Sequence, residues 1–385
     1  MRISNLIATA AVVFGVAAVS VNGQGSSVGE RKDGKRLFER ETFGGNGRTC
    51  LTCHSRETGT LSPEDVARRF EQNPADPLFL FDGSDDGQGH GVTRIMEDAT
   101  ILLEIPLPPN VRLGDDPDAR SVVVRRGIGT TLNTPALDPV LMSDGRRLTL
   151  QDQALGAIQD HTQTLSAIGA PDLDRLREFQ LTDDFFSSPE LRSMARGGIA
   201  PQLPLGNTES ERRGRRFFED RNPILDPTFK EGSCAVCHSG PLLNQTNEFL
   251  PATGAFVPPG TRFQNVLVSE FNGQQFNRPP LNPVHDFIFT NPADGSETHV
   301  YSPDPGRALI TGSLDGFRTF DQVNAFKISI LWGVKNTAPY FHDNSARTLE
   351  EVVAHYTRAF AVATNGLLML TPQDEADIVA YLKLL

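Results

Sequence analysis

Cysteine is scarce in this 385-residue chain, which contains only four. All four lie in two copies of the pattern Cys-x-x-Cys-His, formed by Cys50, Cys53 and His54 and by Cys234, Cys237 and His238. No cysteine is left for a disulfide or for a separate zinc site. The pattern is typical of c-type haem attachment, because two thiols about one helical turn apart add to the vinyl groups and the histidine binds iron. We therefore predict two covalently bound haem c groups; the alternative is one zinc ion shared between the motifs.

Basic charge is also in short supply. The chain carries 36 lysine and arginine residues against 48 aspartate and glutamate residues, for a formal net charge of -12. This acidity argues against nucleic acid or an anionic membrane surface as a partner, and it is compatible with a docking patch for a basic redox protein. Tryptophan occurs once and phenylalanine 24 times, so we expect cores rich in phenylalanine and leucine.

Long apolar runs are missing after the first residues of the chain. Residues 1–23 have the features of a secretory signal peptide, with Arg2 followed by a run from Ile7 to Val21 that is short for a membrane span. The alternative is an uncleaved anchor helix. Because c-type haem is attached outside the cytoplasm in bacteria, export agrees with the two motifs. We expect a periplasmic protein with no membrane span after signal cleavage.

The length of the chain predicts about two domains, each with one haem motif. The 34 glycines and 27 prolines indicate helices separated by long irregular loops. The predicted fold class is all-α, with cytochrome c-like domains at residues 24–196 and 207–385. Residues 189–206 resemble a connecting segment, and we assign the linker itself to residues 197–206.

Capping patterns locate several helix starts. A serine or threonine followed three residues later by an acidic residue marks a helix N-terminus, and this pattern occurs at Ser62, Thr208, Thr348 and Thr371. Further helices are expected at residues 33–43, 148–164 and 172–181, and short extended segments at 101–109 and 121–125. Residues 250–315 are too irregular for elements to be assigned.

The acidic stretch from Asp82 to Gly87 resembles the first half of an EF-hand calcium loop. The twelfth position of such a loop is Thr93 here, so the glutamate that supplies the bidentate ligand is missing. We therefore interpret the stretch as an acidic turn.

The sixth ligand of each iron decides what a dihaem protein does. A filled position gives electron transfer, and an open position binds peroxide or oxygen. In the helix that begins after Thr348, Tyr356 lies on the apolar face with Leu349 and Val353, whereas His355 points about 120° away. Tyr356 is therefore directed inward, either as an ordinary core residue or as an iron ligand.

The expected helix at residues 148–164 is less regular. Gln153 lies on its polar face, and His161 lies near its end. That face is either solvated or lines a haem pocket in which Gln153 and His161 reach the open iron. The pattern alone does not decide between these interpretations.

The order of these motifs resembles the bacterial dihaem cytochrome c peroxidase and MauG superfamily across nearly the whole mature chain. The most specific segment is residues 337–343, Thr-Ala-Pro-Tyr-Phe-His-Asp, followed by residues 348–353. Residues 144–154 match the family segment near the first haem, and residues 212–218 match the start of its second domain.

The resemblance implies different roles for the two haems. The haem on Cys50, Cys53 and His54 would react with peroxide, and the second haem would transfer electrons. Gln153 falls on the family's distal-pocket glutamine. Tyr356 falls where peroxidases carry an axial methionine and MauG an axial tyrosine. A tyrosinate is a hard anionic ligand that favours Fe(III) and lowers the reduction potential, so this residue favours MauG-like behaviour.

The resemblance also implies a calcium ion between the domains. Its ligands would be Asn133 and the backbone carbonyl groups of Thr337 and Pro339. Ligation by oxygen atoms alone suits calcium.

Two positions depart from the family pattern. The catalytic glutamate is replaced by Gln163, whose amide cannot accept and return a proton. His161 is the candidate replacement, and the alternative is a histidine on the helix surface. The family's bridging tryptophan is replaced by Ser143. Trp332 is the candidate relay residue, although a lone tryptophan is more often a core residue.

These observations predict a periplasmic dihaem enzyme that reacts with hydrogen peroxide. In the peroxidase version, a small cytochrome c or cupredoxin supplies electrons. In the MauG-like version, a high-valent dihaem state oxidises a tryptophan or tyrosine side chain of a partner protein. A third hypothesis is a non-enzymatic dihaem electron carrier in which both irons have six ligands.

Overall fold

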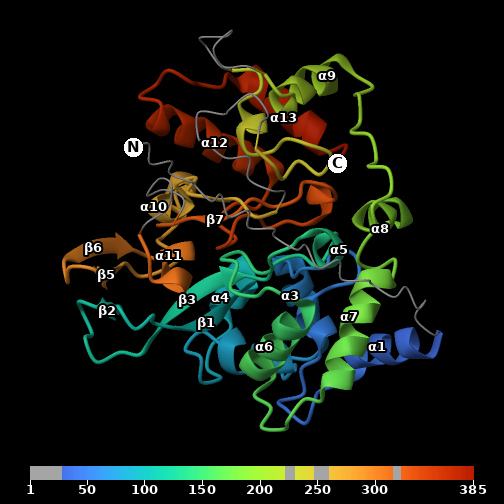
Figure 1. Cartoon of the computed structure of the whole chain (residues 1–385), viewed down its shortest axis with the longest axis vertical. Coiled ribbons are helices and arrows are strands. Elements are labelled where there is room, and N and C mark those ends of the chain that lie inside the picture. Colours follow the sequence, from blue (N-terminus) through green and yellow to red (C-terminus); the bar gives the residue numbers. More distant parts are fainter. Residues whose placement is uncertain (1–27, 222–229, 247–259, 315–321) are drawn as a thin grey trace, which may run out of the picture.

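The computed structural model describes residues 28–221, 230–246, 260–314 and 322–385. Residues 1–23, interpreted above as a signal peptide, lie outside these ranges. The described chain is mostly helical and contains three small sheets. Figure 1 shows the helices of the N-terminal half at one end of the molecule and those of the C-terminal half at the other. Within the described ranges, no helix is long and apolar enough to span a bilayer.

The helices of the N-terminal half follow the capping signals closely. Ser62 accepts a hydrogen bond from the backbone of Asp65 and begins α3 as a reciprocal capping box. The helices in this half are α1 (Val28–Arg40), α2 (Cys50–Cys53), α3 (Pro63–Gln72), α4 (Thr93–Asp98), α5 (Thr134–Leu137), α6 (Leu150–Thr162), α7 (Ala170–Thr182) and α8 (Pro189–Ala195).

The C-terminal half uses the same signals. Thr208, Thr348 and Thr371 each cap a helix, as expected. The helices here are α9 (Glu209–Arg215), α10 (Val268–Phe271), α11 (Arg307–Thr311), α12 (Leu349–Ala363) and α13 (Pro372–Leu382). Short 3-10 helices in the described chain are η1 (Pro77–Phe79), η2 (Phe81–Gly83), η3 (Arg216–Phe218), η4 (Cys234–Val236), η6 (Gln274–Phe276) and η8 (Val334–Asn336).

Each half packs the helix before its haem motif against a later helix at a glycine. A Cβ atom on Gly34 of α1 would overlap the carbonyl group of Arg175 in α7. A Cβ atom on Gly214 of α9 would likewise overlap the carbonyl group of Asp377 in α13. The absent side chains therefore allow the close approach of both helix pairs. The two halves therefore share one type of helix packing, in which a glycine allows the close contact.

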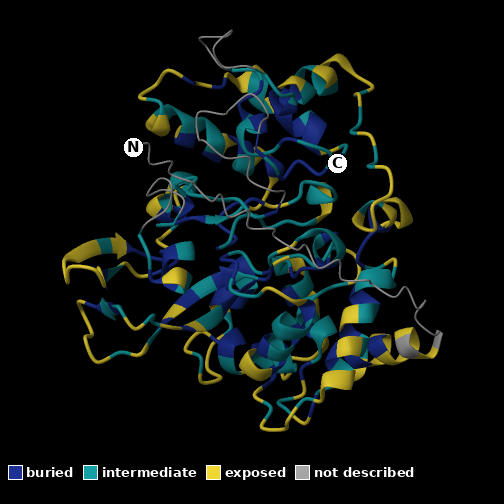
Figure 2. Cartoon of the chain, in the orientation of Figure 1, coloured by how far each residue is buried: buried dark blue, intermediate teal, exposed yellow. Residues whose placement is uncertain are grey.

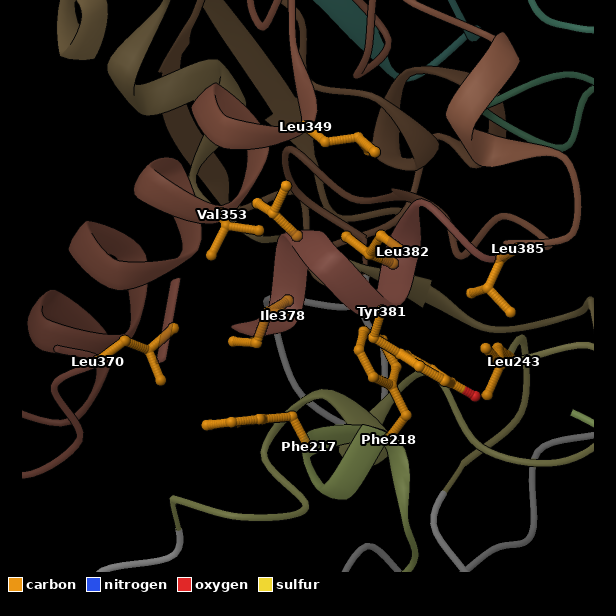
Figure 3. Close-up of a cluster of buried hydrophobic side chains, with 11 residues drawn as sticks. Phe217, Phe218, Leu243, Leu349, Val353, Leu370, Ile378, Tyr381, Leu382 and Leu385 are labelled. Carbon is orange, nitrogen blue, oxygen red and sulfur yellow. The ribbon is translucent and has the colours of Figure 1, made fainter. Parts of the chain in front are cut away.

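Separate apolar cores support these helix pairs, and Figure 2 shows buried residues at the centre of each half. In the N-terminal half, Phe38, Phe179 and Phe186 pack with ring centroids 5.2–5.7 Å apart. Figure 3 shows the C-terminal core, in which Tyr381 lies beside Phe218 with ring centroids 5.4 Å apart. Phenylalanine and leucine dominate both clusters, as composition indicated.

The sheets correct the all-α prediction. Their strands are β1 (Thr100–Pro106), β2 (Val111–Leu113), β3 (Ser121–Gly127), β4 (Phe263–Gln264), β5 (His285–Thr290), β6 (Glu297–Ser302) and β7 (Phe326–Lys327). The antiparallel pairs are β1 with β3, β4 with β7, and β5 with both β2 and β6. Both extended segments expected from the sequence are present, as β1 and β3.

Residues from both halves of the chain meet in a third apolar cluster. Val111 of β2 pairs with Phe289 of β5, and both are buried. The two halves are also joined by the buried guanidinium of Arg126, which binds Asp304 at 2.7 Å and also pairs with Asp144. The division into domains at residues 197–206 stays a prediction, because apolar and ionic contacts join residues on either side of it.

Two segments contain more structure than expected. The connecting segment 189–206 begins with α8, which Ser188 caps by accepting a hydrogen bond from Leu191. Residues 250–315 hold β4, α10, β5, β6 and α11 within their described part. These elements are short and acquire their stability from pairing with distant residues, so local periodicity did not reveal them.

Candidate haem-binding sites

The first motif has the geometry that iron ligation requires. Cys50 and Cys53 delimit α2, and the backbone N–H of His54 donates to the carbonyl of Cys50 at 3.0 Å. The Nδ1 atom of His54 donates to the carbonyl of Gly59 at 2.8 Å, which fixes the tautomer and leaves Nε2 for a metal. Burial lowers the pKa of His54, so the imidazole is neutral, as a metal ligand must be.

The second motif repeats this arrangement. The backbone N–H of His238 donates to Cys234 at 2.8 Å, and its Nδ1 donates to the carbonyl of Leu243 at 2.7 Å. Burial lowers the pKa of His238 to about 4. In each motif the acceptor lies five residues after the histidine and has a positive φ angle, 64° at Gly59 and 54° at Leu243. The turn after each motif thus holds the proximal imidazole in the same way.

The cysteines fit covalent attachment better than zinc binding. Burial raises the pKa of Cys50 and of Cys234 to about 12, so without a bound group both are neutral thiols. Among the described residues, no group of three or more His, Cys, Asp or Glu side chains is arranged to hold a metal ion. The donor sets therefore match two haem c groups.

Charged side chains border the first motif. Asp82 accepts a hydrogen bond from Nδ1 of His161 at 2.7 Å through one carboxylate oxygen, and it pairs with Arg48 through the other. Burial lowers the pKa of His54, and the charge of His161 lowers it further. The pKa of Cys53 is likewise affected by the charges of Arg48 and Asp82, after the dominant effect of burial. His161 therefore lies near the first motif, and its role there stays a prediction.

The two glutamines of α6 have different surroundings. Gln153 is half-buried, and its side chain makes no hydrogen bond within the described part of the chain. Gln163 is exposed at the C-terminal end of the helix, where its Oε1 accepts a hydrogen bond from Asn46 at 3.1 Å. The structure thus brings His161 to the first motif and leaves Gln163 at the surface.

Tyr356 lies near the second motif. Burial raises the pKa of its hydroxyl, and negative charge on Cys237 and Cys234 of this motif contributes in the same direction. The ring of Tyr356 packs against Phe341 and Phe360, with centroids 6.2 and 5.7 Å away. In this environment the phenolate is unfavourable unless a nearby cation such as Fe(III) offsets the cost of burial.

His355 corrects part of the prediction for this helix, because it is 1% exposed, whereas Tyr356, expected to be the inward residue, is only half-buried. The Nε2 atom of His355 donates to the carbonyl of Val266 at 2.8 Å. Its Nδ1 lies 3.4 Å from the amide nitrogen of Gln275. Because both ring nitrogens have protein partners, His355 is not available to iron, and Tyr356 is the better candidate.

Trp332 connects the second motif to the N-terminal half. Its indole Nε1 donates to the carbonyl of Pro241, three residues after His238, at 2.7 Å. Its own carbonyl accepts a hydrogen bond from the side chain of Asn133 at 2.9 Å. Trp332 is only half-buried, so it is not an ordinary core tryptophan.

The proposed calcium ligands lie far apart in sequence, and the fold brings Asn133 to the segment that precedes Thr337 and Pro339. The Nδ2 atom of Asn133 is used by Trp332, which leaves its Oδ1 for a cation. The hydroxyl of Thr337 donates to the carbonyl of Val334 at 3.1 Å, so its backbone carbonyl, like that of Pro339, is the ligand atom to consider. Calcium binding by these residues stays a prediction.

Asp82 and Arg48 are the site residues that the sequence did not reveal. Asp82 was interpreted as part of an acidic turn. Within that stretch, Asp86 accepts a hydrogen bond from His90, and Asp85 accepts one from the backbone N–H of Arg94 in α4. Only the fold brings Asp82 to His161, which lies 79 positions along the chain. The one feature of the local sequence that could have indicated this cluster is Arg48, a basic residue two positions before Cys50.

The chain has partial similarity to one curated protein and to several solved structures. No family model matches the chain. The chain is 29% identical to cytochrome c551 peroxidase of Nitrosomonas europaea over 144 residues, which span 34% of this chain and 40% of that protein. The matched stretch is thus less than half of the relative's length.

Two solved structures align with most of this chain. A MauG-like protein associated with microbial copper homeostasis matches with 20% identity and a TM-score of 0.48, covering 93% of this chain and 88% of its own. The diheme peroxidase BthA from Burkholderia thailandensis E264 matches with 16% identity and a TM-score of 0.49, covering 92% and 85%. The chain is thus similar over part of its length to a cytochrome c551 peroxidase, and it carries two intact Cys-x-x-Cys-His motifs.

Proposed function

We propose that the protein is an exported dihaem c-type oxidoreductase that reduces hydrogen peroxide. The main observation in support of this proposal is that the two sites differ in the residues beside them. Beside the first motif lies His161, a group able to move protons, and beside the second lies Tyr356, a group able to bind iron. In this proposal the first haem reacts with peroxide, and the second supplies electrons to it.

The residues of the first site have separate tasks. Haem iron at His54 would supply an open coordination position for the oxidant. His161 moves a proton between the oxygen atoms of peroxide, a task for which Gln163 is chemically unsuited and, at the surface beside Asn46, badly located. Gln153 offers its amide to the bound oxidant from the same helix.

The residues of the second site control electron flow. Tyr356 and His238 are the residues that would hold the second haem iron, and a tyrosinate ligand would keep its reduction potential low. Trp332 is proposed as a relay, because its hydrogen bonds reach both the second motif and Asn133 in the N-terminal half.

A second candidate function is MauG-like oxidation of a tryptophan or tyrosine side chain on a partner protein. Tyr356 favours it, because an anionic ligand makes higher oxidation states easier to reach. The third hypothesis, an electron carrier, requires that both irons be closed by protein ligands.

Steady-state turnover of peroxide separates these functions. The peroxidase oxidises a reduced small cytochrome c or cupredoxin, with two molecules of donor consumed per molecule of peroxide. A MauG-like enzyme consumes peroxide slowly with such donors and oxidises side chains of its protein partner instead. The carrier exchanges electrons with the donor and leaves peroxide intact, which would refute both enzymatic proposals.

We also propose that calcium binds Asn133, Thr337 and Pro339. Removal of calcium with EGTA should lower the unfolding temperature and the peroxide turnover, and added calcium should restore both. Asn133→Ala should abolish this response. Magnesium is the control, because it needs a smaller octahedral site and should not replace calcium. Indifference of the wild-type protein to EGTA would refute the calcium site.

A further inference from the structure

One loop of the protein makes two Asp–His pairs of identical length. Asp82 Oδ2 lies 2.7 Å from Nδ1 of His161, and Asp86 Oδ2 lies 2.7 Å from Nδ1 of His90. Their surroundings differ sharply. The side chains of Asp82 and His161 are 4% and 20% exposed, whereas those of Asp86 and His90 are 41% and 80% exposed. The first pair is buried beside Arg48, two residues before Cys50, and the second is exposed to solvent.

The buried pair is anchored by Arg48, whose side chain is 2% exposed. Its Nε donates to the carbonyl of Pro77 at 2.8 Å, and its Nη1 donates to the carbonyl of His161 at 3.2 Å. The same Nη1 pairs with Asp82. Arg48 therefore fixes the carboxylate and the backbone of the histidine together, between the haem motif and α6.

Asp82 is ionised in this setting. Burial acts to raise the pKa of Asp82, but the hydrogen bond from His161 and the charge of Arg48 outweigh it, so the net effect is a lowered pKa. An ionised carboxylate accepts hydrogen bonds only, so Nδ1 of His161 must carry a proton. The other ring nitrogen, Nε2, is then the one that takes up and releases protons.

We propose that Asp82 is the positioning residue of the first site, which holds His161 with Nδ1 protonated and Nε2 directed to the reaction. This inference rests on the proposed function. Nε2 accepts a proton from one oxygen of hydrogen peroxide and returns it to the other as the O–O bond breaks. Reduction of one peroxide to two waters consumes two electrons from the reduced cytochrome or cupredoxin and two protons from solvent.

Four variants of the holoprotein test the proposal by peroxide turnover. His161→Gln should lower kcat/KM about 100-fold, the usual scale for a general acid–base group. Asp82→Asn should lower it about tenfold, and Asp82→Glu should restore part of the loss. The matched control, Asp86→Asn, removes the exposed pair of the same loop and should leave kcat/KM unchanged.

A double variant separates positioning from a structural role. If Asp82 acts only through His161, Asp82→Asn should have no further effect on kcat/KM in the His161→Gln protein. An additional tenfold loss there would overturn the proposal. Asp82→Asn leaves the buried charge of Arg48 without its carboxylate partner. The comparison of the single and double variants is therefore repeated with Arg48→Gln in every protein, which removes that charge.

Fluoride gives a readout that does not depend on turnover. It binds a ferric haem with an open position together with a proton, which Nε2 of His161 takes up, and its charge-transfer absorption band shifts when the protonated Nε2 donates a hydrogen bond to it. Asp82→Asn and His161→Gln should shift this band in the same direction, and Asp86→Asn should not. A wild-type protein that shows the band but does not reduce peroxide would refute the proposed function alone. An unaltered band in Asp82→Asn would refute the role of Asp82 alone.

Discussion

The two haem motifs hold their proximal histidines alike and differ in what lies nearby. His54 and His238 each donate from Nδ1 to a carbonyl five residues later, and burial keeps both neutral. Beside the first motif the chain places an ionic cluster, and beside the second it places Tyr356 among aromatic rings. The shared part suits iron binding, whereas the differing parts suit proton transfer on one side and a closed iron on the other.

The largest effect should come from removing one haem at a time. Cys50→Ser combined with Cys53→Ser should lower the protein mass by one haem and abolish the reaction with peroxide. Cys234→Ser combined with Cys237→Ser should also lose one haem, but the remaining haem should still react with peroxide in stopped-flow absorption. Equal loss of the peroxide reaction in both proteins would contradict the division of roles.

Substitution of Gly34 and Gly214 tests whether the two halves are equivalent in helix packing. Gly34→Ala and Gly214→Ala should each destabilise the fold by about 2 kcal/mol, because the added methyl group overlaps a carbonyl group of the facing helix. The control is Gly129→Ala, where no heavy atom lies within 4 Å of the added carbon. Chemical unfolding measures all three. A large difference between Gly34→Ala and Gly214→Ala would show that the halves are not equivalent in packing.

Tyr356→Met should raise the reduction potential of the low-spin haem by on the order of 100 mV, because a thioether favours Fe(II). Tyr340→Phe is the control, since the hydroxyl of Tyr340 donates to the carbonyl of Val334 at 2.9 Å. Redox titration followed by absorption spectroscopy gives the potentials. If Tyr356→Met left both the spectrum and the potential unchanged, Tyr356 would be a core residue.

The smallest effect is expected at Trp332. Trp332→Phe removes the hydrogen bond to Pro241, which should cost about 1 kcal/mol of stability, and it removes the oxidisable indole. Electron transfer between the haems should slow, as measured by stopped-flow after mixing with peroxide. Trp332→Tyr, which keeps an oxidisable ring, should retain more of the rate. Equal rates in all three proteins would eliminate the relay.

The sequence predicted those parts of the protein that depend on local chemistry. The cysteine spacing identified both haem motifs, and the caps at Ser62 and Thr348 located two helices that the structure contains. The apolar stripe on α12 predicted Tyr356 as the inward residue, but the structure buries His355 more deeply than Tyr356. Each of these signals lies within a few residues of the feature that it predicts.

Features that depend on distant pairing were missed. The strand β5 is stabilised by β2, far earlier in the chain, so residues 285–290 carry no strong signal of their own. Asp82 was assigned to a turn because its partners Arg48 and His161 lie far from it in sequence. Gln163 was judged unsuited to proton transfer from its chemistry, and its place at the helix end required the fold.

The most direct test of the contrast between the two sites is the EPR spectrum of the ferric holoprotein before and after one equivalent of peroxide. We predict one high-spin haem and one low-spin haem, with the high-spin signal lost on addition of peroxide. Two low-spin signals that persist unchanged after peroxide would mean that both irons are closed by protein ligands, and they would contradict the account.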